Sequence, residues 1–221
     1  MPVFKDKNED FFKKWSSEMA YVLGFILADG SLIISRRGAK YVEIETVDGD
    51  LLNLIKEKLN SDLKISERQR NKKWKKAYRL QIGSKEIFND LLKLGIKPRK
   101  TGSETMPKVP MDYLRDFIRG YFDGDGSIWM GYAHKKNRLY PTLALSLVFT
   151  SASDRLLGQI KRILENRLEI KGSQRYYGNA FRLCYSTFAA INLYNFLYGN
   201  GSSNLFLQRK KKKFEEYLKM K

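Results

Sequence analysis

The sequence predicts an α+β fold made of two similar halves on one chain. The segment from Val22 to Gly30 (VLGFILADG) recurs 96 residues further on, from Ile118 to Gly126 (IRGYFDGDG). Each copy is followed by a serine, an apolar residue and then an alternating run typical of a β-strand, from Tyr41 to Val47 and from Thr142 to Thr150. Two copies in the same order indicate an internal repeat.

The elements that follow each strand repeat as well. Apolar residues at helical spacing begin at Leu51 in the first half and at Leu156 in the second. Each half then has a second pair of predicted strands, at 62–67 with 78–82 and at 168–176 with 180–185, and a closing helix, at 85–94 and at 188–198. Both halves therefore have the order helix–strand–strand–helix–strand–strand–helix, or αββαββα.

Prolines and glycines interrupt the chain between the two halves, so no single helix can contain that stretch. They are Pro98, Gly102, Pro107 and Pro110. We expect an N-terminal half-domain over residues 1–100, a linker over 101–112 and a C-terminal half-domain over 113–221. Neither half offers much core by itself, so the halves should pack against each other. The basic, amphipathic tail after Asn204 fits a solvated helical face and a DNA contact equally well.

Composition restricts the chemistry. Lys and Arg number 42 against 24 Asp and Glu, a formal charge of +18, which favours a polyanionic partner such as nucleic acid. One cysteine, Cys184, allows no internal disulfide or zinc finger, and one histidine, His134, argues against histidine-based hydrolysis. Carboxylates acting with hard metal ions remain. With no apolar run of bilayer length, we expect no membrane partner and an intracellular location in the cytoplasm, nucleoid or an organelle matrix, not secretion.

The repeated segment has the pattern of a closely packed helix. Gly24 and Ala28 are four residues apart, as are Gly120 and Gly124, so each pair lies on one helical face where another backbone can approach. We therefore expect the two repeated helices to pack on each other. The glycines that follow, Gly30 and Gly126, suit the left-handed residue that ends many helices.

Asp29 and Asp125 fall in the last turn of these helices, where the helix dipole disfavours an acid by roughly 0.3–1 kcal/mol. In a parallel pair the two carboxylates would also repel each other, by on the order of 3 kcal/mol at about 5 Å and an effective dielectric near 20. A divalent cation would offset both penalties, and Mg²⁺ accepts one or two carboxylates with water and phosphate oxygens. The alternative is two ordinary Asp-Gly turns; their repetition beside two small-residue faces favours the functional interpretation.

These residues resemble the LAGLIDADG homing endonucleases, in the form with both motifs on one chain. The resemblance extends to KLGIKP at 93–98, DFIRGYFDGDGS at 116–127 and QRKKKKF at 208–214. It implies a pseudo-symmetric monomer in which each half presents a curved, saddle-forming antiparallel sheet to the major groove of a long duplex. It also implies hydrolysis of both strands with Mg²⁺, leaving short 3′ overhangs, with Mn²⁺ as a substitute and Ca²⁺ binding without supporting cleavage.

The same resemblance implies roles for individual residues. Asp29 and Asp125 would bind metal, joined by the carbonyls of Ala28 and Gly124, whereas Asp123 occupies a variable position and is not expected to be a ligand. A catalytic lysine near the end of the last strand maps to Lys85, which could equally be an ordinary residue of a helix's first turn. The second half has Phe188 there, so Lys210 is the candidate substitute, and unequal cutting of the two strands is expected.

Reading of DNA is expected from polar side chains on the sheet faces and their loops. Thr46 and Ser151 are interpreted as a matched polar pair beneath the sheets. The basic loop from Arg68 to Lys76 is either a solvated hairpin tip or a phosphate contact, and we favour the contact. The candidates are Arg36, Arg37, Lys40, Glu43, Glu45, Thr46, Arg68, Arg70, Lys75 and Arg79 in the first half, and Lys135, Arg138, Ser151, Arg175, Tyr177, Arg182 and Lys210 in the second.

Two alternatives use the same fold without cutting DNA. One is an RNA maturase, which would make intron RNA a second candidate partner, and the other is a non-cleaving DNA-binding protein. The presence of both Asp29 and Asp125 argues against either as the sole activity. An intein is less expected, because the chain starts at Met1 without a splicing Cys or Ser and ends in Lys-Met-Lys.

Overall fold

The structure is a computed structural model that describes residues 5–69, 71, 73, 75–98, 101–134, 139–199 and 204–221. The first half contains α1 (Ser17–Asp29), β1 (Gly30–Ile34), β2 (Lys40–Thr46), α2 (Gly49–Lys58), β3 (Ser66–Arg68), β4 (Ala77–Gly83) and α3 (Lys85–Lys93). The second contains a 3-10 turn (Met111–Tyr113), α4 (Leu114–Asp125), β5 (Gly126–Ala133), β6 (Thr142–Ser151), α5 (Asp154–Leu168), β7 (Ser173–Tyr177), β8 (Ala180–Ser186), α6 (Thr187–Tyr198) and α7 (Gln208–Met220). The predicted α+β class and element order are confirmed.

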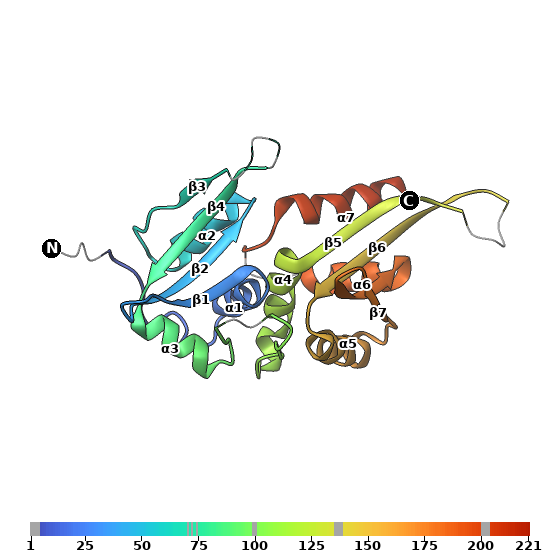
Figure 1. Ribbon diagram of the computed structural model, residues 1–221. Helices are drawn as coiled ribbons and strands as arrows, with labels where there is room; N and C mark the ends of the chain where they lie inside the picture. The colour runs from blue at the N-terminus through green and yellow to red at the C-terminus, as the bar shows by residue number, and fades with distance from the viewer. Residues whose placement is uncertain are drawn as a thin grey trace.

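Each half forms one antiparallel sheet, ordered β1-β2-β4-β3 in the first and β5-β6-β8-β7 in the second. Helices α2 and α3 pack on one face of the first sheet, and α5 and α6 on one face of the second (Figure 1). Alternate residues such as Val42 and Ile44 of β2 are buried beneath the helices. The residues that alternate with them, Glu43 and Glu45, lie on the opposite face, so each sheet keeps one face open.

Two strands are shorter than predicted. The stretch before β3 has no strand pairing until Ser66, and β7 begins at Ser173 instead of residue 168. The second difference arises because α5 continues its helical apolar spacing through the buried Leu164 to Leu168. Glu169 then ends the helix in a left-handed conformation, with φ 52°. The prediction of a strand from residue 168 was therefore wrong at its start.

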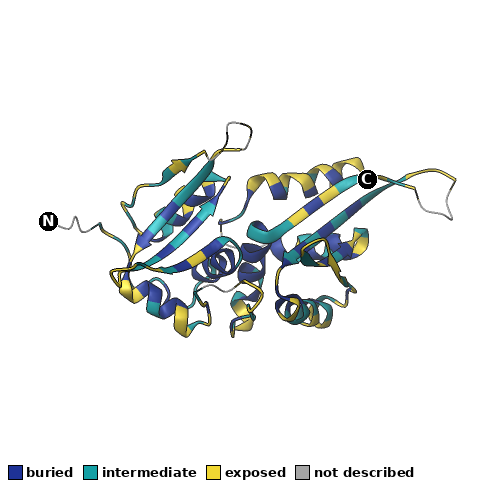
Figure 2. Ribbon diagram, viewed as in Figure 1, coloured by how far each residue is buried: buried dark blue, intermediate teal, exposed yellow. Residues whose placement is uncertain are grey.

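The motif helices α1 and α4 pack against each other as parallel neighbours at the centre of the molecule (Figure 1). A Cβ atom added to Gly24 would lie 2.1 Å from the carbonyl oxygen of Phe117, and one on Gly120 would lie 2.0 Å from that of Tyr21. Both distances are far below van der Waals contact, so only glycine permits this approach. Met19–Leu27 of α1 and Asp116–Asp123 of α4 are buried throughout (Figure 2), and the expectation that these helices form the interface is confirmed.

Gly30 and Gly126 end the motif helices, but not in the predicted conformation. Their φ angles are −95° and −97°, with extended ψ values, so neither is left-handed. Glycine is required there for space: a Cβ on Gly30 would meet the backbone of Ile26 at 2.7 Å, and one on Gly126 would meet the ring of Phe122 at 2.1 Å. At both glycines the chain therefore turns directly from helix into strand.

Helix α7 lies along β5 and against α6 (Figure 1). A buried ion pair of α4 holds the chain that leads to it. Arg119 donates to the carbonyls of Leu197 and Leu205, at 2.7 and 3.0 Å, and pairs with Asp116 at 2.6 Å. At the start of α7, Arg209 reaches across to the first half, where its guanidinium pairs with both carboxylate oxygens of Asp48 at 2.8 and 2.7 Å. In the part of the chain that the structure describes, no helix is long and apolar enough to span a bilayer.

Candidate nucleic-acid interface and cleavage centre

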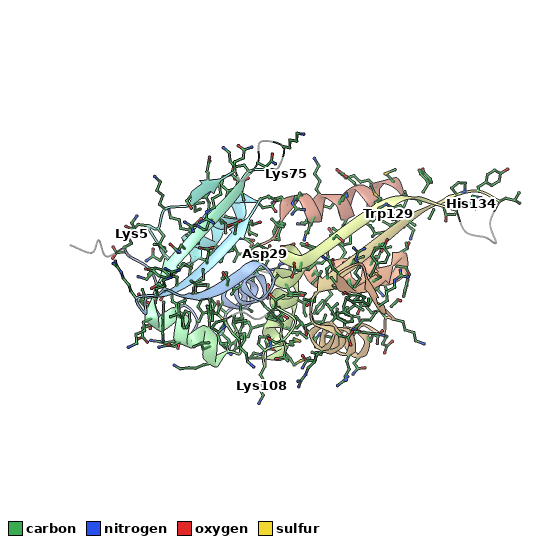
Figure 3. All side chains as sticks on the ribbon, in the orientation of Figure 1. Lys5, Asp29, Lys75, Lys108, Trp129 and His134 are labelled. Carbon is green, nitrogen blue, oxygen red and sulfur yellow. The ribbon has the colours of Figure 1, made fainter. Side chains whose placement is uncertain are left out.

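Asp29 and Asp125 end the two parallel motif helices, and both line one cavity of about 420 Å³. Figure 3 shows Asp29 at the junction of the two halves. A Cβ atom on Gly124 would lie 2.4 Å from Cβ of Ala28 and 3.4 Å from Oδ2 of Asp29. The carboxylate of α1 therefore lies against the backbone of α4, one residue before Asp125. The sequence placed both acids in the last helical turn, and the structure brings them to one space.

Tyr121 forms part of the same cavity, and its hydroxyl donates to the carbonyl of Thr150 at 2.8 Å. Burial raises the pKa of Tyr121, and the negative charges of Asp125, Glu104 and Asp29 raise it further, in that order. The charges that act on this hydroxyl show that the cavity is acidic on this side. Its remaining lining includes Lys97, Thr101 and Ser151.

The donors in the cavity fit a hard divalent cation. Within the described residues, no three side chains of His, Cys, Asp or Glu come together in a way that could hold an ion by themselves. A cation beside Asp29 and Asp125 would therefore take the rest of its oxygen ligands from main-chain carbonyls, water and substrate. Mg²⁺ is suited to such a set, because it retains waters and binds through one or two carboxylates and phosphate oxygens.

Lys210 is buried beneath the end of α4, with 4% of its surface exposed. Its ammonium donates to the carbonyls of Phe122, Asp123 and Gly126, at 2.6, 2.8 and 2.6 Å. Burial lowers its pKa to about 8, against the opposing effect of the Asp123 charge. We expected Lys210 among the DNA contacts, but its ammonium is used on two carbonyls of α4 and on that of Gly126, the first residue of β5. There its charge offsets the negative end of the helix dipole.

Asp123, which was not expected to be a metal ligand, is also buried. Its carboxylate accepts from the hydroxyl of Tyr21 at 2.7 Å and from the backbone N–H of Leu207 at 2.8 Å. Burial raises the pKa of Asp123, and the nearby charge of Lys210 opposes that rise. The residue therefore links α1, α4 and the start of the tail, a structural role that the motif alone did not reveal.

Lys85 does not share the cavity with the aspartates. It is the first residue of α3, just after Gly83, and Gly83 pairs with Tyr41 near the start of β2. Asp29 is adjacent to Gly30, which pairs with Ile44 at the other end of β2. Three residues along a strand correspond to about 10 Å, with further distance across the sheet. The prediction of Lys85 beside the aspartates was therefore wrong.

The exposed Lys97 takes the place in the cavity that was predicted for Lys85. Sequence reasoning placed Lys97 only at the end of the first half. No local pattern marks it as a site residue, because its position depends on the path by which the chain leaves α3 and passes the motif helices. The buried Ile96 beside it anchors that path.

Thr46 and Ser151 occupy matching positions at the ends of β2 and β6, and both are buried, with 9% and 6% of their surface exposed. The hydroxyl of Thr46 accepts from the N–H of Asp48 at 3.3 Å, and that of Ser151 from the N–H of Ser153 at 3.0 Å. They form the matched pair that the sequence indicated, but each closes a turn. Neither lies on an open sheet face.

The open face of the first sheet carries a network of charged side chains. Glu43 and Glu45 of β2 stand opposite Gln81 and Arg79 of β4. Arg79 pairs with Glu43 at 3.1 Å, and Arg68 of β3 pairs with Glu45 at 3.4 Å. The predicted side chains of these three strands therefore share one face.

Lys40, by contrast, reaches the covered side of the first sheet. Its ammonium donates to the side chain of Asn89 in α3 at 2.8 Å and lies 5.1 Å from the centroid of the Phe88 ring. Its expected place among the groups that read DNA was wrong, because the first strand residue packs against the helix that covers the sheet.

The open face of the second sheet is less charged and more aromatic. Arg175 of β7 stands opposite Arg182 of β8, and Arg182 lies 4.5 Å from the centroid of the Tyr177 ring. These three predicted residues therefore lie together. The sequence analysis did not single out Trp129 of β5, which is 50% exposed (Figure 3). Trp129 lies opposite Ser146 of β6, and Ser146 pairs with Ser186 of β8. Trp129 therefore lies on the open face.

The remaining candidates lie in loops. Arg36 and Arg37 are exposed in the turn between β1 and β2, and Lys75 is exposed between β3 and β4. Figure 3 shows Lys75 near the tip of that connection and His134 far out along the β5–β6 hairpin. Arg70, Lys135 and Arg138 lie outside the described residues.

Comparison with protein-family models gives a match to the LAGLIDADG-like domain in two segments, residues 16–95 and 112–197. Two relatives are found in Methanocaldococcus jannaschii. An uncharacterised protein is 27% identical over 123 residues, which cover 51% of this chain and 40% of that protein. The replication factor C small subunit is 31% identical over 116 residues, 52% of this chain and 6% of that protein. The chain thus corresponds to less than half the length of either relative.

Solved structures share the fold over nearly the whole chain. The meganuclease I-AabMI bound to uncleaved DNA has a TM-score of 0.63 at 14% identity, over 90% of this chain and 88% of that one. The homing endonuclease I-WcaI bound to its DNA recognition sequence has a TM-score of 0.61 at 16% identity, over 93% and 90%. I-SmaMI bound to an uncleaved DNA target in the presence of calcium ions has a TM-score of 0.64 at 14% identity, over 94% and 90%.

Proposed function

The chain belongs to the LAGLIDADG-like domain family, and from this premise we propose that it is a site-specific DNA endonuclease. It hydrolyses both strands of a long duplex site with divalent metal ions. The observation that carries the proposal is the position of Asp29 and Asp125, which end two parallel helices and line one cavity between two sheets with open faces.

The DNA lies across the two open faces, with the aspartate pair at the middle of the site. A formal charge of +18 provides the attraction that phosphate backbones require. The arginines and glutamates of the first sheet, and Arg175, Tyr177 and Arg182 of the second, are side chains of the kinds that contact base edges or phosphates. The DNA-bound states of I-AabMI and I-WcaI support duplex DNA as the partner. Because one chain supplies both aspartates, a monomer completes the centre.

In the proposed mechanism Asp29 and Asp125 hold the metal ions, with the carbonyls of Ala28 and Gly124 available beside them. Divalent cations held there would lower the pKa of a water and stabilise negative charge on the attacking and leaving oxygens. Water adds to phosphorus and the 3′ oxygen leaves with a proton. Hydrolysis on each strand, offset across the minor groove, gives short 3′ overhangs.

Two lysines of the chain, Lys210 and Lys97, act on the groups that take part in hydrolysis. Lys210 holds the end of α4 through three carbonyls and so fixes where the Asp125 main chain can lie. Lys97 lines the cavity and can orient water or offset charge that develops on phosphate oxygens. The different placement of these two lysines makes the two strand-cutting centres unequal. Mg²⁺ is the proposed ion, with Mn²⁺ as a substitute; the uncleaved target of I-SmaMI with calcium supports Ca²⁺ as a binding ion that does not promote cleavage.

The test begins with a randomised library of duplex DNA incubated with the full chain and Mg²⁺, with sequencing of the cleaved ends. The proposal predicts one recurrent long site, cut on both strands with a 3′ stagger. In parallel reactions, Mn²⁺ should support cutting and Ca²⁺ should allow binding without cutting. With chelator the chain should not cut. Specific binding with no cleavage under any metal condition would contradict an endonuclease and direct the work to intron splicing or to a non-cleaving regulator.

A further inference from the structure

Glu104 is an acid of the cleavage cavity that the family motifs do not include. It lies in the connection between α3 and the 3-10 turn, and its side chain lines the cavity with Asp29 and Asp125. Two hydrogen bonds to the second half fix the path of this connection. The carbonyl of Glu104 accepts from the hydroxyl of Ser153 at 2.7 Å, and the N–H of Met106 donates to the side chain of Gln159 at 2.9 Å.

One carboxylate oxygen of Glu104, Oε2, is buried and has no hydrogen-bond partner among the described residues. A buried carboxylate oxygen without a partner is unfavourable, and such groups in native proteins usually meet a water molecule or an ion. Lys97 lines the same cavity, but it makes no hydrogen bond to Oε2. The charge of Glu104 acts on the Tyr121 hydroxyl together with those of Asp125 and Asp29, so three negative groups surround this part of the cavity.

The other side of the aspartate pair has the opposite character. The cavity beside Gly126, about 270 Å³, is lined among the described residues by Gly126, Ser127, Ile128, Arg209, Lys210 and Lys213. Its charged members are all basic. The first cavity therefore has an additional carboxylate together with the exposed Lys97, and the second has a buried lysine and an arginine that pairs with Asp48.

Glu104 acts on the ion indirectly. Within the described part of the chain no three acidic side chains are close enough to hold one ion together, so direct ligation by Asp29, Asp125 and Glu104 is not the arrangement. A hydrated divalent cation held by the aspartates would instead place one of its waters within reach of a nearby carboxylate, and Mg²⁺ and Mn²⁺ keep several waters in such sites. Oε2 is closed to water in this structure, so the Glu104 carboxylate would turn toward the cavity when the cation binds and would there accept from one of its waters.

We propose that Glu104 is a third acidic residue of the cleavage centre, which accepts a hydrogen bond from a water of the hydrated divalent cation and strengthens cation binding on its side of the aspartate pair. This rests on the proposed endonuclease function. It also says which of the two DNA strands is cut first. The centre beside Glu104 binds its cation more tightly, and the DNA strand at that centre is cut first.

The experiment is a titration of the full chain with Mn²⁺ alone, in which free Mn²⁺ is followed by electron paramagnetic resonance. The variants are Glu104→Gln, which keeps the shape of the side chain and removes its charge, and Asp125→Asn, which removes an expected ligand. The matched control is Glu57→Gln, which removes the same charge from an exposed position on α2. We expect Glu104→Gln to weaken Mn²⁺ binding about tenfold, within the usual effect of a residue that acts through a ligand. Glu57→Gln should bind as the wild type does.

The outcomes separate this inference from the proposed function. If Asp125→Asn loses Mn²⁺ binding and Glu104→Gln binds like the wild type, the role of Glu104 is overturned and the metal centre stands. If the wild type binds no Mn²⁺, or Asp125→Asn has no effect, the metal centre itself is contradicted. Thermal unfolding monitors the fold, and Glu104→Gln should be about as stable as the wild type, because the change keeps the shape of the side chain. Strand-resolved cleavage should show that this variant slows one strand more than the other.

Discussion

Gly120 of α4 lies directly on the backbone of Tyr21 in α1, so closely that a Cβ atom at Gly120 would stand 2.0 Å from the Tyr21 carbonyl oxygen. Gly24 has the reciprocal relationship with Phe117. This backbone contact fixes how far apart the ends of the two helices can be. The position of Asp29 relative to Asp125 is therefore a consequence of the two glycines, each five residues before its aspartate.

Gly120→Ala should lower the free energy of unfolding by about 3 kcal/mol or more, because the added methyl meets backbone that cannot move aside without separating the helices. Gly158→Ala is the matched control. Gly158 lies within α5, and the nearest atoms to an added Cβ are 3.9 Å away on the side chain of Gln174. That substitution should raise stability by about 0.5–1 kcal/mol. Urea unfolding of the two variants measures both effects, and equal stabilities would contradict the close approach.

The Arg209–Asp48 pair should couple the tail to the first half only weakly. Arg209 is 56% exposed on its side chain, so its bidentate contact with Asp48 competes with water and salt. A double-mutant cycle with Arg209→Ala and Asp48→Ala should give a coupling energy of about 0.2–1 kcal/mol that falls as salt increases. A coupling energy that does not change between low and high salt would show that the pair is buried in solution.

Arg79 should contribute to sequence recognition on the first sheet. Arg79→Ala should weaken binding to the preferred duplex by about 1–3 kcal/mol and relax preference at one base-pair position, because the side chain lies on the open face beside Glu43. Arg155→Ala is the control, since this exposed arginine is on α5, which covers the opposite face of the second sheet. Fluorescence anisotropy on matched and mismatched duplexes measures both. Equal losses for the two variants would contradict the assignment of the open faces.

Stability should fall as the pH rises above about 10. Burial raises the pKa of Tyr21, Tyr121 and Tyr198 in the folded protein. Above pH 10 the unfolded chain loses these protons while the folded chain keeps them, so the unfolded state binds fewer protons and is favoured. One pH unit above the unfolded pKa, each such tyrosine removes about 1.4 kcal/mol.

Unfolding free energies at pH 9 and 11 measure this effect. Tyr121→Phe should lose less stability between the two pH values than the wild type. Tyr132→Phe, at a position that is 69% exposed, should lose as much as the wild type. A steeper loss in Tyr121→Phe would contradict the burial of that hydroxyl.

The internal sequence repeat predicts most of the fold. The Gly24/Ala28 and Gly120/Gly124 faces predicted the helix pair, and alternation in 41–47 and 142–150 predicted two central strands and the open-face side chains of β2. Periodicity misplaced the start of β7, because the apolar spacing of α5 continues through Leu168.

The groups that the sequence misassigned depend on chain paths that no local pattern records. Lys85 follows its strand as predicted, yet that strand end points away from Asp29. Lys97 and Glu104 reach the cavity because the connection after α3 passes the motif helices. Lys210 belongs to a basic run that reads as solvated, but the contacts of Arg119 and Asp123 draw the start of α7 onto α4 and bury it.

The most direct test of the central claim, that Asp29 and Asp125 together form one cleavage centre, is cleavage of the selected duplex in Mg²⁺ by Asp29→Asn and Asp125→Asn. Each variant should fold and bind the duplex with near wild-type affinity but cut at least about a hundredfold more slowly. A variant that binds and cuts at the wild-type rate would contradict the pairing of the two carboxylates.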